Sequence, residues 1–167
     1  MLGYGPKLFE SEGWVRHCLD DGTPALLRDI IQWSPKFRQE ALEKMVANPP
    51  ESDFGLEELL VIPEVRDEVW RLIKGCEKHF PHTLREAFYR LNPPEKREAW
   101  QLLVAEYGKM DQNNHAVADD WFLEAMSKDD SAEYREEARA LIARLNNLPK
   151  PLWRMLQDFK CGDMEDV

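Results

Sequence analysis

Apolar side chains recur along this 167-residue chain at the spacing of amphipathic α-helices. Ala118, Trp121, Phe122 and Ala125 follow the i, i+3, i+4, i+7 pattern that places side chains on one helix face. A second run, at residues 65–73, nearly repeats this spacing. The sequence contains no alternating β-branched stretch bounded by a tight-turn dipeptide, which would be typical of a strand. The pattern therefore predicts an all-α fold in which each helix buries one face.

The hydrophobic pattern and its breaks predict about ten short helices. Their expected ranges are 10–20, 24–33, 35–47, 53–61, 63–79, 82–91, 93–108, 115–127, 131–146 and 151–160. Taken in pairs along the chain, these helices would form hairpins. Residues 1–160 are expected to form a single helical domain, and residues 161–167 an acidic, disordered tail.

Prolines mark several of the expected helix starts. Pro24, Pro35 and Pro93 each follow a Thr, Ser or Asn, and a proline at the first helical position sacrifices no intrahelical hydrogen bond. Asn92 also has Glu95 three residues further on, which is the spacing of a capping box. These residues favour helices beginning at 24, 35 and 93.

A short cassette of Arg, then Glu, then Ala or Val recurs behind these helix starts. It occurs at residues 37–41, 65–69, 84–87, 96–99 and 134–138. The helical pairs that carry it resemble HEAT-type repeats, in which a proline-led helix and an Arg- and Ala-bearing helix stack side by side. The resemblance implies stacked hairpins that bind partners. Because the cassettes are irregularly spaced, an irregular compact bundle is the alternative architecture.

Tryptophan is frequent enough to shape the expected core. We expect these large side chains to pack inside, where each could bury about 200 Å². They are Trp14, Trp33, Trp70, Trp100, Trp121 and Trp153.

The net charge of −10 narrows the classes of partner. Binding to nucleic acid or to an anionic membrane needs clustered Lys and Arg, so neither is expected, whereas a basic protein would be attracted. The three cysteines show no paired spacing, which is typical of a reducing cytosol, and the first residues lack the pattern of a signal peptide. The sequence therefore predicts a cytoplasmic protein that binds another protein.

Catalytic and cofactor motifs are missing from the sequence. There is no Gly-x-Ser-x-Gly elbow and no glycine-rich phosphate loop, so we expect no catalytic residue, no cofactor and no enzyme activity. Cys76, His79 and His82 form the one spacing that suggests a metal, and a metal-dependent protein built on them is one alternative. The competing interpretation is that Cys76 packs inward while His79 interacts with the end of its helix.

Acidic residues concentrate between positions 111 and 133, where Lys128 is the single basic residue. The candidate partner-binding residues are Asp111, Asp119, Asp120, Glu124, Asp129, Asp130 and Glu133. Such a stretch could occupy a basic groove as nucleic-acid phosphates do, or it could be an ordinary solvated helix face. The leading hypothesis is a non-enzymatic regulator or adaptor that acts through a helical surface. An acidic inhibitor of a nucleic-acid-binding protein, of the immunity or anti-defence type, is the alternative.

Overall fold

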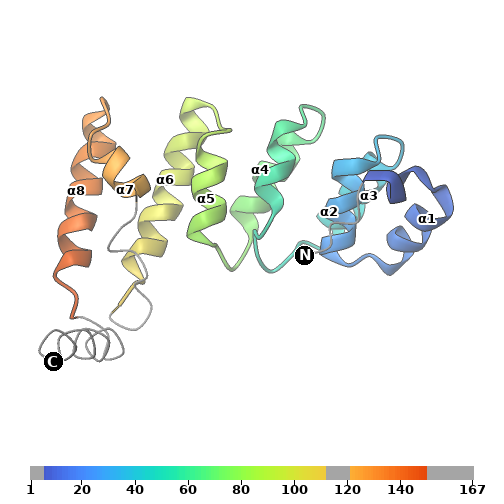
Figure 1. Cartoon of the computed structure of the whole chain (residues 1–167), viewed down its shortest axis with the longest axis horizontal. Coiled ribbons are helices and arrows are strands. Elements are labelled where there is room, and N and C mark those ends of the chain that lie inside the picture. Colours follow the sequence, from blue (N-terminus) through green and yellow to red (C-terminus); the bar gives the residue numbers. More distant parts are fainter. Residues whose placement is uncertain (1–5, 112–120, 150–167) are drawn as a thin grey trace, which may run out of the picture. The chain divides into compact units, whose positions relative to one another are not determined.

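The structure, a computed structural model, is an all-α fold and describes residues 6–111 and 121–149 (Figure 1). Its elements are η1 (Pro6–Glu10), α1 (Glu12–Asp21), α2 (Pro24–Trp33), α3 (Arg38–Ala47), η2 (Leu56–Val61), α4 (Arg66–Gly75), α5 (Pro81–Phe88), α6 (Pro93–Gly108), α7 (Trp121–Met126) and α8 (Ala132–Asn146), where η denotes a 3-10 helix. Within the described ranges there is no β-strand, only an isolated parallel bridge between Ser52 and Lys78.

Most of the expected helices are present, and α2 and α6 begin and end at the predicted residues. The expected helix at 151–160 and the first residues of the one at 115–127 lie outside the described residues. The capping-box prediction is confirmed in part, because the Asn92 amide donates a hydrogen bond of 2.9 Å to the Glu95 carboxylate. Gly22 ends α1 in the left-handed conformation, with φ of 69°.

Three predicted helix starts are wrong, and one of them is the start expected at residue 63, because α4 begins only at Arg66. Ser34 does not begin a helix at Pro35, because its amide still donates to Ile30 O at the end of α2, and α3 starts only at Arg38. The helix expected from residue 53 begins instead at Leu56, as a 3-10 helix that follows Gly55. Asp53 does not cap this helix because its carboxylate is bound to another part of the chain.

The chain divides into two compact units, Met1–Leu102 and Leu103–Val167, with the border inside α6. In the first unit, α2 packs on α1, α3 and η2, while η2 also packs on α4 and α5. The side chains that are almost completely buried here include Leu27, Ile30, Ile31, Met45, Leu59, Ile73, Leu84 and Trp100. Burial of the Leu, Ile and Met side chains among them contributes about 1.5–3 kcal/mol each. The prediction of a single domain over residues 1–160 stays a prediction.

Polar contacts join α4 to the first half of α6. The Glu98 carboxylate accepts hydrogen bonds from Trp70 Nε1 at 3.1 Å and from Lys74 Nζ at 2.8 Å. One turn away, the Arg66 guanidinium makes a bidentate ion pair with Glu95. Arg66 and Glu95 side chains are 18% and 21% exposed, so this pair is shielded from water more than an ordinary surface pair.

In the second unit, α8 packs on α7 around Phe122, Leu123 and Leu141. Arg144, near the end of α8, donates hydrogen bonds to the carbonyl oxygens of Tyr107 and Gly108, each at 2.8 Å. These carbonyls lie in the last turn of α6, which lacks further intrahelical donors. Arg144 therefore serves as a side-chain cap for the end of α6.

The tryptophans are divided between the interior and the surface. Trp70 and Trp100 are buried as expected, but Trp14, Trp33 and Trp121 are 38%, 43% and 57% exposed, so the prediction of burial is wrong for these three. Their helices pack through smaller side chains, such as Val15 in α1, and turn part of each indole ring outward. Trp153 lies outside the described residues. Among the helices of the described part, none is both long and apolar enough to cross a membrane.

Candidate functional site

A buried aspartate joins two loops of the first unit. Asp53 precedes η2 and has a completely buried side chain, while His79 in the loop before α5 is 9% exposed. His79 Nδ1 lies 2.9 Å from Asp53 Oδ2, and the Phe80 amide donates to Asp53 Oδ1 at 3.1 Å. Both carboxylate oxygens are therefore satisfied, as the burial of a carboxylate requires.

Backbone hydrogen bonds reinforce the same junction. The Asp53 amide donates to Lys78 O at 3.2 Å, and the amides of Glu77 and Lys78 both donate to Glu51 O, at 3.1 and 3.0 Å. At the surface, Lys78 Nζ pairs with the Glu51 carboxylate at 2.9 Å. The two loops are thus held in one register by main-chain and side-chain bonds together.

Burial and hydrogen bonding act in opposite directions on the Asp53 carboxyl. Loss of water raises the pKa of Asp53, and this effect is the largest. The hydrogen bonds from His79 and from the Phe80 amide favour the ionised form and reduce that rise in pKa. The pair with His79 therefore offsets part of the free energy that burial of the carboxylate costs.

The residues that follow Asp53 and His79 point outward. Phe54 is 61% exposed and Phe80 is 45% exposed, and their ring centroids lie 5.9 Å apart with an interplanar angle of 70°. This edge-to-face arrangement is a favoured geometry for aromatic pairs. We call Phe54 and Phe80 the aromatic patch.

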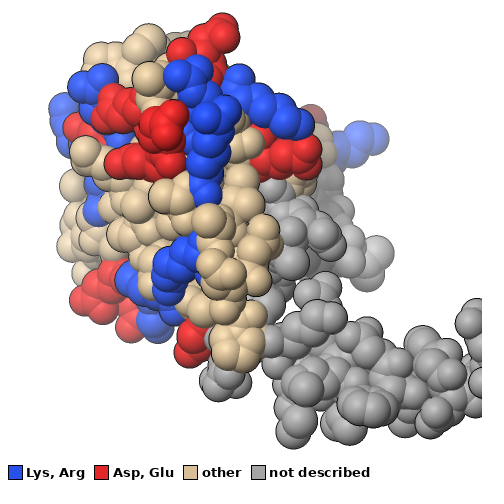
Figure 2. Space-filling model, turned by 90° about the vertical axis from the view of Figure 1, so that its left-hand side faces the viewer, with Lys and Arg blue, Asp and Glu red and all other residues tan. Residues whose placement is uncertain are grey.

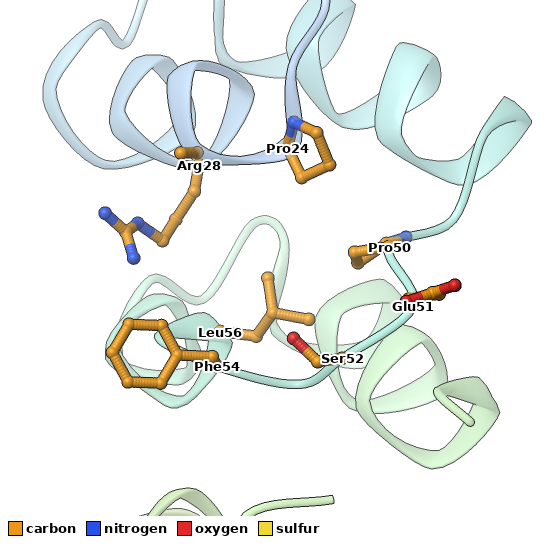
Figure 3. Close-up of a pocket in the computed structure, with 8 residues that line it drawn as sticks. Pro24, Arg28, Pro50, Glu51, Ser52, Phe54 and Leu56 are labelled. Carbon is orange, nitrogen blue, oxygen red and sulfur yellow. The ribbon is translucent and has the colours of Figure 1, made fainter. Parts of the chain in front are cut away.

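A pocket of about 390 Å³ adjoins Phe54 (Figure 3). We call it the proline pocket, and it lies between the start of α2 and the segment that leads into η2. Its lining residues are Pro24, Ala25, Arg28, Pro50, Glu51, Ser52, Phe54 and Leu56. The side chains of Pro24, Pro50 and Leu56 supply an apolar wall, and the Arg28 guanidinium and the Phe54 ring lie at the same end of the pocket in Figure 3.

Gly55 is required for the position of Arg28. Its φ of 79° favours glycine, and a Cβ at this residue would lie 2.2 Å from Arg28 Nη1. On its other side, the Arg28 guanidinium donates to Asp29 Oδ1 from Nε at 3.3 Å and from Nη2 at 3.1 Å. The glycine therefore leaves the space in which Arg28 reaches the pocket.

The structure does not bring Cys76, His79 and His82 together as metal ligands. The Cys76 thiol donates to Leu72 O at 3.2 Å, and His79 is bound to Asp53. Burial raises the pKa of Cys76 to about 11, which disfavours the thiolate that a metal would need. Over residues 6–111 and 121–149, no group of three or more His, Cys, Asp or Glu side chains could hold a metal ion.

Glu57, in η2, is a second buried carboxyl close to this junction. It is 7% exposed, and its Oε2 has no hydrogen-bond partner among the described residues. Burial has the largest effect and raises the pKa of Glu57. The negative charge of Glu58 raises this pKa further, whereas the positive charges of His82 and Arg90 partly oppose the rise. This carboxyl is therefore more easily protonated than an exposed glutamate.

The predicted acidic surface is interspersed with basic side chains where the structure describes it. Glu124 pairs with Lys128 at 2.7 Å, which lowers the pKa of Glu124, and Asp129 Oδ1 accepts from the Ser131 amide at 2.8 Å. Asp111, Asp130 and Glu133 are exposed, whereas Asp119 and Asp120 lie outside the described residues. Arg135, Arg139 and Arg144 in α8 add positive charge to the same unit. Figure 2 shows acidic and basic side chains side by side on the face turned to the viewer.

Sequence reasoning missed the aromatic patch and the proline pocket. The predicted helices 53–61 and 63–79 place residue 53 at a helix start and Phe80 directly after a helix end, and they give no indication that Phe54 and Phe80 are exposed. A usable signal was the Ser-Asp-Phe-Gly turn at residues 52–55, since a turn seldom buries a phenylalanine that has no helix face to pack on. The pairing of this turn with residues 77–80 is a long-range contact that has no local signature.

Comparison with known proteins finds no match: no family model, no curated protein and no solved structure is similar to this chain. The resemblance to HEAT-type repeats therefore stays a prediction.

Proposed function

We propose that the chain is a non-enzymatic regulator or adaptor that binds another protein through the aromatic patch and the adjoining proline pocket. The observation that carries this proposal is the outward position of Phe54 and Phe80 at a junction that is otherwise tightly bonded. Exposed aromatic rings on a rigid support are typical of the residues that dominate binding energy at protein interfaces.

The rigid backbone beneath the aromatic patch supports the proposal that the patch binds a partner. Asp53 and His79 anchor the backbone on which the two rings stand, so binding a partner would cost little conformational entropy. Two neighbouring aromatic rings and an apolar pocket would also give a partner a concentrated area to cover. A helical-hairpin architecture, which the HEAT-type resemblance implies, is compatible with this use.

Capture of partners from a lysate of the natural source tests the proposal. Full-length chain carrying both Phe54→Ala and Phe80→Ala should lose proteins that the unchanged chain retains, as measured by quantitative mass spectrometry. Val61→Ala is the matched control, because Val61 is 65% exposed but does not line the proline pocket. Recovery of the same proteins in the same amounts by the double variant would contradict the proposal.

A further inference from the structure

We infer that the proline pocket binds an extended peptide segment of the partner, which inserts one apolar side chain and places an Asp or Glu carboxylate against Arg28. This inference rests on the proposed function and adds the chemistry of the segment that is recognised. It is carried by the charge and the shape of the pocket lining.

Arg28 provides the positive charge of the pocket lining. The other charged lining residue, Glu51, already has Lys78 as its partner at 2.9 Å. The Arg28 side chain is 24% exposed, so its charge is partly shielded from water and from salt. A carboxylate that binds Arg28 would therefore form a stronger ion pair than it would with a fully exposed arginine.

Arg28 retains hydrogen-bonding capacity after its contact with Asp29. Nε and Nη2 share the single oxygen Asp29 Oδ1, and no hydrogen bond joins Nη1 to another described residue. A guanidinium has five N–H donors in a planar arrangement that suits a carboxylate. Asp29 therefore orients the guanidinium and leaves donors for a ligand.

The remaining lining determines what accompanies the carboxylate. Pro24, Pro50 and Leu56 form an apolar wall around a volume of about 390 Å³, large enough for a Leu, Phe or Trp side chain. Ser52, also in the lining, offers a hydroxyl at the edge of this wall. An apolar residue with an acidic neighbour satisfies both features of the pocket at once.

An array of synthetic peptides tests this chemistry with the full-length chain. Each peptide is a nine-residue segment, acetylated and amidated at its ends, with Leu, Phe or Trp at the centre and Glu, Gln or Lys at the neighbouring positions. We expect the Glu peptides to bind about tenfold more tightly than the Gln peptides, a difference of about 1.4 kcal/mol, since a hydrogen bond to a charged group is stronger than one to a neutral group. The Lys peptides should bind more weakly still.

Variants of the chain assign this preference to Arg28. Arg28→Gln should bind Glu and Gln peptides equally, and Phe54→Ala should weaken both. Arg71→Gln is the matched control, because Arg71 lines a second pocket and is likewise paired with a carboxylate of its own helix, that of Glu68. Arg71→Gln should keep the preference for Glu. Thermal unfolding verifies that each variant is folded. If Arg28→Gln is unstable, Arg28→Lys replaces it, and this variant should keep part of the preference for Glu peptides because it keeps the positive charge.

Several results would overturn the inference. These are the absence of binding, equal binding of Glu, Gln and Lys peptides, and a preference for Glu that survives in Arg28→Gln. If one of these results is obtained but capture of partners still depends on Phe54 and Phe80, the inferred acidic segment is wrong and the proposed function is not contradicted. Capture that does not depend on these rings would instead contradict the proposed function.

Discussion

Asp53 and His79 form a buried hydrogen bond of 2.9 Å, and the residue that follows each of them is an exposed phenylalanine. The same two loops thus contribute a polar contact to the interior and the aromatic patch to the surface. The bridge between Ser52 and Lys78 aligns the two loops, so one backbone pairing positions both the buried contact and the exposed rings.

Replacement of Asp53 should destabilise the fold markedly. Asp53→Ala removes two hydrogen bonds and leaves His79 Nδ1 and the Phe80 amide without an acceptor, so we expect a loss of about 2–4 kcal/mol in the free energy of unfolding. Glu51→Ala is the control, since it breaks the exposed pair with Lys78 and should cost much less than Asp53→Ala. Urea unfolding followed by Trp fluorescence measures both. Equal losses would show that the junction at Asp53 contributes no more than a surface ion pair.

The Glu57 carboxyl should make stability depend on pH. Because burial raises the pKa of Glu57 in the folded state above its ordinary value of 4.5, the folded chain holds this proton more tightly than the unfolded chain does. The associated stabilisation is present below pH 4.5 and is lost as the pH rises through the raised pKa. Glu57→Gln, which has no such proton to lose, should therefore be more stable than the unchanged chain at pH 8, by about 1 kcal/mol. Thermal unfolding at pH 4 and pH 8 measures this, and a difference that is the same at both values would contradict the assignment.

The ion pair between Arg66 and Glu95 should contribute more than pairs at the surface. Glu95→Ala removes the bidentate contact and the hydrogen bond from the Asn92 amide, so we expect a loss of about 1–2 kcal/mol in the free energy of unfolding. Glu40→Ala is the comparison, because the Arg16–Glu40 pair is 56% and 41% exposed and should contribute about 0–1 kcal/mol. The difference should also shrink in acid, since the contact with Arg66 lowers the pKa of Glu95 and its stabilising effect is lost as the pH falls through that value. The free energies of unfolding of Glu95→Ala and Glu40→Ala, measured at pH 7 and at pH 3, test this prediction.

Two glycines with positive φ allow backbone strain to be separated from a side-chain contact. Gly22→Ala should cost about 1 kcal/mol, because the nearest atom to its new Cβ would be Leu19 O at 3.8 Å. Gly55→Ala carries the same backbone strain and in addition displaces Arg28. We therefore expect Gly55→Ala to weaken binding of Glu peptides while Gly22→Ala leaves it unchanged. Equal affinities in the two variants would show that the position of Arg28 does not depend on Gly55.

The thiols of Cys18 and Cys76 should react slowly in the folded chain. Cys18 is 0% exposed and Cys76 is 7% exposed, and burial raises the pKa of both thiols. Alkylation by iodoacetamide at pH 8, followed by peptide mass spectrometry, should label both residues much faster in urea than in native buffer. Rapid labelling of Cys76 in native buffer would mean that the end of α4 opens readily.

The helices could be predicted from the sequence because their signals are local. The proline that begins α6 and the contact between Asn92 and Glu95 lie within a few residues of each other, and so do the left-handed Gly22 and the end of α1. The aromatic patch could not be predicted, because it depends on a carboxylate at residue 53 meeting residues 79 and 80. For the same reason, the spacing of Cys76 and His79 suggested ligands, although each has a different partner in the fold.

The buried and the exposed residues of this junction are under different evolutionary constraints. Asp53 and His79 maintain the fold, and a change at either would be selected against whatever the partner. Phe54 and Phe80 contribute little to the interior, so related chains could exchange them for other side chains and acquire new partners on an unchanged scaffold.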